Sequence, residues 1–177
     1  MARFCTIAIV KQEQPQATSL QERSENVTID DMSRQRIYIN DKNRLLERAT
    51  PQRGTVSYQT TPNSNEQRTI DWLYNNIGGN ITVLAENNPD GLPNPDLLWN
   101  NVLVDIKHTG GTWRTLDGHV HKSMKQTNNG GVIIDVTGTL LEDVSIIDTV
   151  RRRLNGRNGA FAIVLKNEEL LAYLTEE

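Results

Sequence analysis

The sequence predicts an α/β (α+β) fold in which helices flank a mixed β-sheet. From residue 63 onward the expected elements run helix, strand, two-stranded hairpin, helix, strand, helix, strand. Helices that alternate with strands after an initial meander are typical of a sheet with helices packed on it. A chain of 177 residues is also long enough to form one well-buried domain.

The chain divides into two regions of different composition. Residues 11–62 are rich in Gln, Ser, Thr, Asn and Arg, and their apolar residues are scattered. This composition disfavours a packed core. We therefore expect a polar N-terminal segment over residues 1–62, weakly ordered or linker-like, with one or two short elements. The domain itself is expected over residues 63–177.

Composition and charge exclude several classes of protein. Charged residues make up 23% of the chain and the net charge is −3, so the chain as a whole is not a basic nucleic-acid binder. The single cysteine, Cys5, excludes an internal disulfide framework. The apolar run at residues 4–10 is too short to cross a bilayer and lacks a signal-peptide cleavage pattern. We expect a strand there, and no membrane as a partner.

The first helix of the domain is marked at both ends. Ser64 and Gln67 fit a capping box, and Gly78-Gly79 predicts the end of the helix. The apolar residues at helical spacing between them are Ile70, Leu73, Tyr74 and Ile77. Glu66 lies four residues before Ile70 and so on the same inward face. Its carboxylate either interacts with the helix dipole or belongs to a site.

Apolar patterns predict the remaining elements. The expected strands are 81–85, which ends at Glu86, then 132–136 and 160–165, with 170–174 pairing back along the last; the expected helices are 119–128 and 142–155. Residues 132–136 are nearly continuously apolar, as in a central strand covered on both faces.

Between these elements lies a β-hairpin. Asn100-Asn101 tolerates the positive φ of a two-residue turn. The predicted pairs are Trp99 with Val102, Leu98 with Leu103, Leu97 with Val104, and Asp96 with Asp105. Because side chains alternate along a strand, one face is apolar and should be buried. That face carries Leu97, Trp99, Val102, Val104 and Ile106.

The other face of the hairpin carries two carboxylates opposite each other. The Cβ atoms of Asp96 and Asp105 are expected about 5 Å apart, where like charges destabilise a sheet. A positive group should lie between them, and a divalent cation such as Mg²⁺ (or Mn²⁺) is the natural candidate for hard oxygen ligands. Lys107 points to the same side and can reach whatever the cation holds.

These residues carry a resemblance to a known family. Pro95-Asp96 followed by Asp105-Ile106-Lys107 resembles the motif of the PD-(D/E)xK nuclease superfamily. The wider run from Glu86 to Lys107 is similar to the C-terminal nuclease domains of contact-dependent inhibition and other polymorphic toxins. The resemblance covers roughly residues 63–177 and implies a restriction-endonuclease-like core and a Mg-dependent endonuclease.

The resemblance also implies roles for single residues. It implies Asp96, Asp105 and Glu86 as metal ligands, with the Ile106 carbonyl, and Lys107 as a catalytic residue. Glu86, at the end of a strand, could instead hydrogen-bond loop amides. Glu66 matches a glutamate of the first helix that often reaches the metal in this superfamily.

A locally basic stretch follows the hairpin. Residues 107–126 contain four Lys or Arg against one acid, in a chain that is acidic as a whole. This inversion favours a phosphate backbone near the site, although a solvated helix face is the alternative. The expected nucleic-acid-binding residues, matching a basic helix of the toxin nucleases, are His119, His121, Lys122, Lys125 and Gln126. The two histidines could instead bind zinc, or act as acid and base in a metal-free ribonuclease.

The sequence leaves the substrate and biological role as expectations. The toxin resemblance implies RNA, tRNA in particular, with DNA as the alternative. It also implies a cognate immunity protein and action in the bacterial cytoplasm after delivery as part of a larger toxin. The competing class is a catalytically inactive nucleic-acid or protein interaction module of the same fold.

Overall fold

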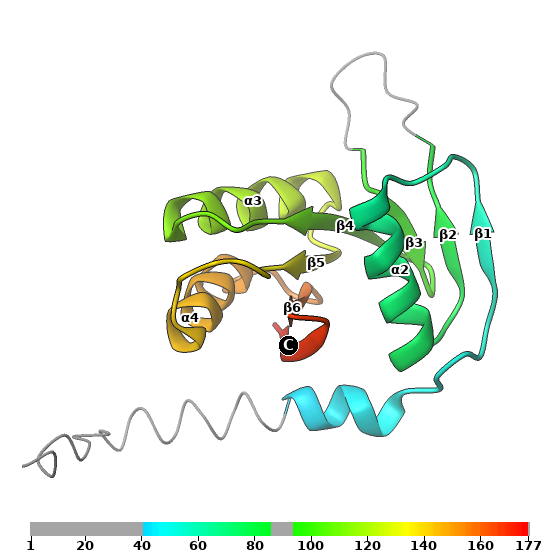
Figure 1. Cartoon of the computed structure of the whole chain (residues 1–177), viewed down its shortest axis with the longest axis horizontal. Helices are drawn as coiled ribbons and strands as arrows, with labels where there is room; N and C mark the ends of the chain where they lie inside the picture. The colour runs from blue at the N-terminus through cyan, green and yellow to red at the C-terminus, as the bar shows by residue number, and fades with distance from the viewer. Residues whose placement is uncertain (1–40, 86–93, 177) are drawn as a thin grey trace, which may run out of the picture.

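The computed structural model describes residues 41–85 and 94–176 and confirms the predicted fold class. This part of the chain forms one mixed seven-stranded sheet with helices on both faces (Figure 1). No helix within it is both long and apolar enough to span a bilayer.

The elements have the following bounds. The strands are β1 Val56–Tyr58, β2 Ile81–Val83, β3 Leu97–Trp99, β4 Val102–His108, β5 Gly131–Asp135, β6 Phe161–Lys166 and β7 Glu169–Thr175. The labelled helices are α2 Ser64–Asn76, α3 Trp113–Gln126 and α4 Asp143–Leu154, and a further helix covers residues 41–48.

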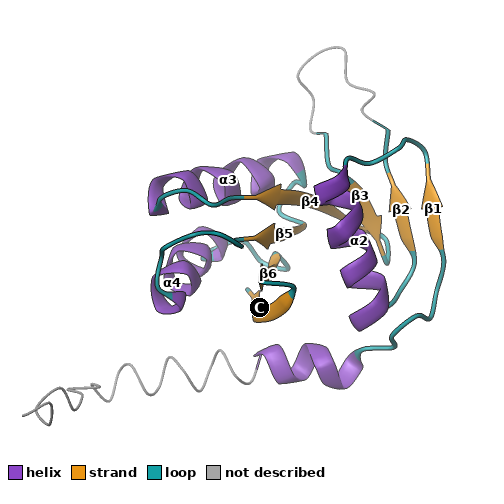
Figure 2. Cartoon of the chain, viewed as in Figure 1, coloured by secondary structure: helices purple, strands orange, loops and turns teal. Residues whose placement is uncertain are grey.

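The seven strands lie in the sheet in chain order. The pairs β1–β2, β4–β5 and β5–β6 are parallel, while β2–β3, β3–β4 and β6–β7 are antiparallel. Each parallel pair is joined through a helix, which is the connection that parallel strands require. Figure 2 shows these helices beside the strands that they connect.

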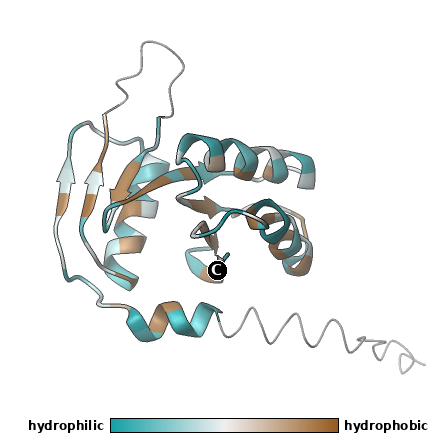
Figure 3. Ribbon diagram, turned by 180° about the vertical axis from the view of Figure 1, so that it is seen from behind, coloured by the Kyte–Doolittle hydropathy of each residue, from teal (hydrophilic) through white to brown (hydrophobic). Residues whose placement is uncertain are grey.

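Two hydrophobic cores, one on each face of the sheet, hold the helices in place. Along β5, Val132 and Ile134 pack with α3 and α4, whereas Ile133 between them packs with α2. All three are fully buried, which confirms the prediction of a central strand covered on both sides. In Figure 3 the central strands are hydrophobic, and the helices carry both hydrophobic and hydrophilic residues, as amphipathic helices do.

The hairpin has the predicted register from Leu97 to Val104. Asn100 and Asn101 have φ values of 47° and 68°, as the two central residues of a type I′ turn require. One prediction was wrong: Val102 is 37% exposed, because it follows the turn directly, at the end of the sheet.

Two helix boundaries differ from the prediction. The N-cap of α2 is Asn63 rather than Ser64, and its box partner is Glu66 rather than Gln67. Asparagine is as good an N-cap as serine, so the box fits one residue earlier. Helix α3 begins six residues before the predicted start, because Leu116 lies in the same buried row as Val120 and Met124.

Residues upstream of position 63 contribute to the same sheet and core. Strand β1 pairs with β2, and Leu45 of the first described helix is buried among residues of α2 and the sheet. Nη2 of Arg44 donates to Oγ1 of Thr175 at 2.7 Å, which ties this helix to β7. The sheet therefore begins at Val56. The expected weak order of the N-terminal segment stays a prediction for residues 1–40, including the strand at 4–10, which lie outside the described residues.

Candidate functional site

The hairpin and α3 together position the candidate site. Asp105 and Lys107 alternate along β4 with Val104 and Ile106, which pack into the core on the α2 face. Asp105 and Lys107 therefore point to the other face, toward α3. Asp96 precedes β3, and its carboxylate turns to the edge of β4, where Oδ2 accepts a hydrogen bond from the Ile106 amide at 2.6 Å.

The ammonium of Lys107 lies among three oxygen atoms of this hairpin. Its Nζ is 2.7 Å from Oδ2 of Asp105, 3.9 Å from Oδ2 of Asp96 and 3.0 Å from the carbonyl oxygen of Ile106. The positive group near both carboxyls in this structure is the ammonium of Lys107, and the divalent cation expected between Asp96 and Asp105 stays a prediction. These three oxygens belong to the donor set that the sequence predicts for a metal.

Asp105 is completely buried and is held by α3 as well as by Lys107. Oγ of Ser123 donates to its Oδ2 at 2.5 Å. With the amide of Gln126 oriented to satisfy its neighbours, its nitrogen donates to Oδ1 and Oδ2 at 3.1 and 3.3 Å. Since a buried carboxylate requires hydrogen bonds, these two residues fix Asp105 in position.

Ser123 is a site residue that the sequence patterns did not predict. Its side chain is fully buried on α3, four residues after His119 and three before Gln126. Residues at this spacing share one face of a helix. That spacing is the signal that would have found it.

Asp96 has a strongly perturbed acidity. Burial first, and the negative charge of Asp105 second, raise its pKa to about 7, although the Ile106 amide and Lys107 act in the opposite direction. Near neutral pH this carboxyl is therefore partly protonated. Two carboxylates confined together cannot both ionise easily without further positive charge.

Of the two predicted glutamates, Glu66 and Glu86, the structure describes only Glu66. Glu66 lines a cavity of about 500 Å³ together with Asp96 and Ile106. Its Oε2 also accepts a hydrogen bond from the Asn63 amide at 3.0 Å, as part of the capping box. Glu86 lies outside the described residues. Within those that are described, no three His, Cys, Asp or Glu side chains cluster as a metal site.

The predicted nucleic-acid-binding residues all lie on α3, but they divide between two sides of it. His119, Lys122 and Gln126 share the face that turns to Asp105. His121 and Lys125 lie on the side toward the basic end of α4, since Arg153 and Arg157 both act on His121. Histidines two residues apart on a helix point apart, so this pair does not converge on a zinc ion.

Both histidines have lowered pKa values. Burial, then the charges of Lys107 and Lys122, lower the pKa of His119. The charge of Lys125 is the largest cause for His121. Both rings are therefore neutral at pH 7, and His119 is the one placed beside the carboxylates.

Fold and site define an α/β protein with a lysine-bridged pair of carboxylates at the end of a β-hairpin. No family model matches the sequence, and no curated protein matches it. Among solved structures, a chain of the CdiA-CT/CdiI toxin and immunity complex from Burkholderia pseudomallei is similar in fold, with 13% identity and a TM-score of 0.44. The match covers 68% of this chain and 99% of that chain.

Proposed function

We propose that this protein is a metal-dependent nuclease that hydrolyses phosphodiester bonds at the site formed by Asp96, Asp105 and Lys107. The observation that carries the proposal is the convergence of two carboxylates and the Ile106 carbonyl on the Lys107 ammonium. Carboxylate and carbonyl oxygens are the ligands that Mg²⁺ and Mn²⁺ prefer. Burial and the charge of Asp105 raise the pKa of Asp96, so a cation that bound these oxygens would favour the ionised carboxylate.

The residues that would hold the ion are Asp96, Asp105 and the Ile106 carbonyl. Glu66 or Glu86 would complete the set, Glu66 by virtue of lining the same cavity as Asp96. A bound divalent ion would neutralise the scissile phosphate and lower the pKa of a bound water. Lys107 Nζ and the proton of Asp96 would compete with such an ion for the same oxygens.

Residues of the chain itself would bind and orient the substrate. Lys107 would offset the negative charge that develops on the phosphate. Lys122, exposed on the α3 face that turns to the site, would bind the backbone. His119, neutral at pH 7 and beside Lys107, would exchange a proton near the leaving group.

The motif resemblance supports the narrower part of the proposal. We propose a toxin domain that cleaves RNA, with tRNA the favoured substrate, delivered into the bacterial cytoplasm and neutralised by an immunity protein. A DNase with the same site is the second candidate. An inactive interaction module is the third, but it would gain stability by losing one of the two carboxylates.

The experiment is to incubate the protein with total tRNA and with plasmid DNA, each with Mg²⁺, with Mn²⁺ and with EDTA. Cleavage only with metal supports the nuclease, and the substrate that breaks decides between RNA and DNA. Cleavage that survives EDTA would support a metal-free mechanism in which His119 acts as the acid or base. Absence of cleavage with both metals rejects the nuclease in favour of the interaction module.

A further inference from the structure

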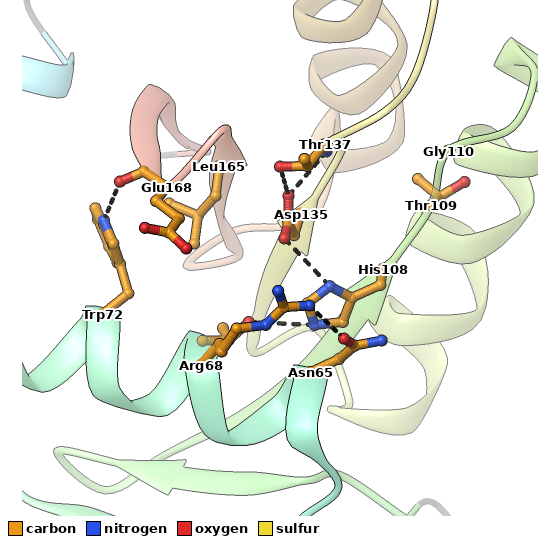
Figure 4. Close-up of a pocket in the computed structure, with 11 residues that line it drawn as sticks. Asn65, Arg68, Trp72, His108, Thr109, Gly110, Asp135, Thr137, Leu165 and Glu168 are labelled. Atoms are coloured by element: carbon orange, nitrogen blue, oxygen red, sulfur yellow. Dashed lines mark hydrogen bonds and ion pairs between the residues drawn. The ribbon is translucent and has the colours of Figure 1, made fainter.

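A second cavity, of about 290 Å³, lies at the carboxyl ends of the parallel strands. His108 of β4, Asp135 of β5 and Leu165 of β6 are register partners and form a row across its floor. Helix α2 forms the opposite wall with Arg68, Thr69 and Trp72 (Figure 4). Ligands of open α/β sheets bind outside the carboxyl ends of their strands.

A chain of hydrogen bonds makes the floor of this cavity rigid. Nδ1 of His108 is 3.2 Å from Oδ2 of Asp135, and Nε2 is 3.2 Å from Oγ1 of Thr69. Asp135 in turn accepts from the amide and hydroxyl of Thr137 at 2.8 and 2.6 Å. A His108 tautomer with its proton on Nδ1 satisfies both neighbours.

The order hydroxyl, imidazole, carboxylate is also that of a nucleophilic triad. Thr69, however, is only 3% exposed and lies within α2, so its hydroxyl is not open to a substrate. The three residues therefore build a binding surface rather than a nucleophile.

Three groups of the cavity are available to a ligand: the Arg68 guanidinium, the Glu168 carboxylate and the Trp72 ring. Trp72 is half-buried, and its Nε1 donates to the main-chain carbonyl of Glu168 at 2.8 Å. Figure 4 shows the Glu168 carboxylate and the Arg68 guanidinium on different sides of the cavity. Among the described residues, Arg68 donates to Asn65 but forms no ion pair, and the Glu168 carboxylate accepts no hydrogen bond.

We infer that this cavity binds an unpaired guanine base of the nucleic-acid substrate, an inference that rests on the proposed nuclease function. Lys107 and His108 are consecutive at the carboxyl end of β4 and point to opposite faces, so the catalytic site and the cavity lie on the two faces of the sheet at this end of the strand. In the proposed complex the nucleic acid passes around this end, with the scissile phosphate on the α3 face and a neighbouring base in the cavity.

The chemistry of the cavity favours guanine over the other bases. An ionised carboxylate only accepts hydrogen bonds, and guanine presents two adjacent donors, N1–H and its amino group. Uracil and thymine present one N–H between two carbonyls, which a carboxylate repels. Trp72 offers a surface for stacking, and Arg68 offers donors to the guanine O6 and N7 atoms or to a phosphate.

The test combines binding and cleavage. The 5′-monophosphates of guanosine, adenosine, cytidine and uridine are titrated against the protein while tryptophan fluorescence is followed. Guanosine monophosphate should saturate the wild-type signal, and Trp72→Phe should remove the change, with Trp99 and Trp113 left in place. Glu168→Gln should lower the affinity for guanosine monophosphate about tenfold. Glu169 is an exposed neighbour outside the cavity, so Glu169→Gln should leave this affinity unchanged.

Cleavage sites mapped on total RNA give the second readout. The wild type should cut beside guanine, Glu168→Gln should lose that preference while still cutting, and Lys107→Ala should bind guanosine monophosphate without cutting. Saturable guanosine monophosphate binding in a protein that cuts nothing would reject the nuclease and keep the cavity assignment. Cleavage without base preference, or equal binding of all four monophosphates, would overturn the cavity assignment and leave the nuclease standing.

Discussion

The ammonium of Lys107 lies 2.7 Å from Oδ2 of Asp105, a carboxylate with no exposed surface. The same ammonium is 3.9 Å from Oδ2 of Asp96, and the negative charge of Asp105 helps to raise the pKa of that second carboxyl. Removing Lys107 therefore leaves two buried or half-buried carboxylates without their positive partner.

We predict that Lys107→Met lowers cleavage at least about 100-fold, the usual cost of losing a group that stabilises transition-state charge. It should also lower the free energy of unfolding in EDTA by about 3–5 kcal/mol, because a buried charge loses its partner. Rate assays and denaturant unfolding measure the two effects. Lys166→Ala, which removes a surface pair with Asp143, is the control. It should change neither the cleavage rate nor the free energy of unfolding strongly. A fully active Lys107→Met protein would rule out the assigned role.

The raised pKa of Asp96 predicts an unusual pH dependence of stability. Its folded-state pKa of about 7 lies above the ordinary value of 3.8, so the folded protein binds this proton more tightly. The resulting stability is complete below pH 3.8 and is lost as pH rises through 7. Thermal unfolding in EDTA should show this loss, and Asp96→Asn should remove it. An Asp96→Asn profile identical to that of the wild type would contradict the assignment.

Ser123 should matter although it does not touch solvent. Ser123→Ala removes a hydrogen bond to buried Asp105, and we expect a loss of about 1–3 kcal/mol in the free energy of unfolding. Cleavage should fall as well, because Asp105 is less firmly held. Ser145→Ala, on the exposed start of α4, is the control. Equal activity and stability of Ser123→Ala and the wild type would show that α3 does not position the carboxylate.

The division of α3 into two sides predicts different effects of its two lysines. Lys122→Ala should weaken substrate binding. The slope of the logarithm of the binding constant against the logarithm of the salt concentration should also fall, by about the amount expected for one lost phosphate contact. Lys125→Ala should have a smaller effect, because Lys125 lies toward Arg153 and Arg157. Binding of uncleaved RNA in EDTA, measured over a range of salt concentrations, compares the two. A larger effect of Lys125→Ala would place the substrate on the α4 side instead.

Local patterns in the sequence were enough to predict much of this fold. The hairpin register follows from Asn100-Asn101 and strand alternation, and the burial of β5 follows from its continuous apolar run. Capping is less determinate, since Asn63 and Ser64 are both good N-caps and only tertiary context selects one.

The contacts that sequence could not supply are those between distant elements. Asp96, Asp105 and Lys107 can be placed together from sequence because a single hairpin carries them. Ser123 meets Asp105 only because α3 packs on that face. Likewise, His108 meets both Asp135 and Thr69 only after β4, β5 and α2 have assembled, so no local pattern points to that cavity.

In the proposed site a divalent ion binds between Asp96 and Asp105. Calorimetric titration of Mn²⁺ into the wild type and into Asp105→Asn, at pH 6 and pH 8, measures this binding. We predict one site in the wild type, tighter at pH 8 because Asp96 must lose its proton, and no binding to Asp105→Asn. A wild type that binds no Mn²⁺ at pH 8, or an Asp105→Asn protein that binds it equally well, would contradict a metal site at these two carboxylates.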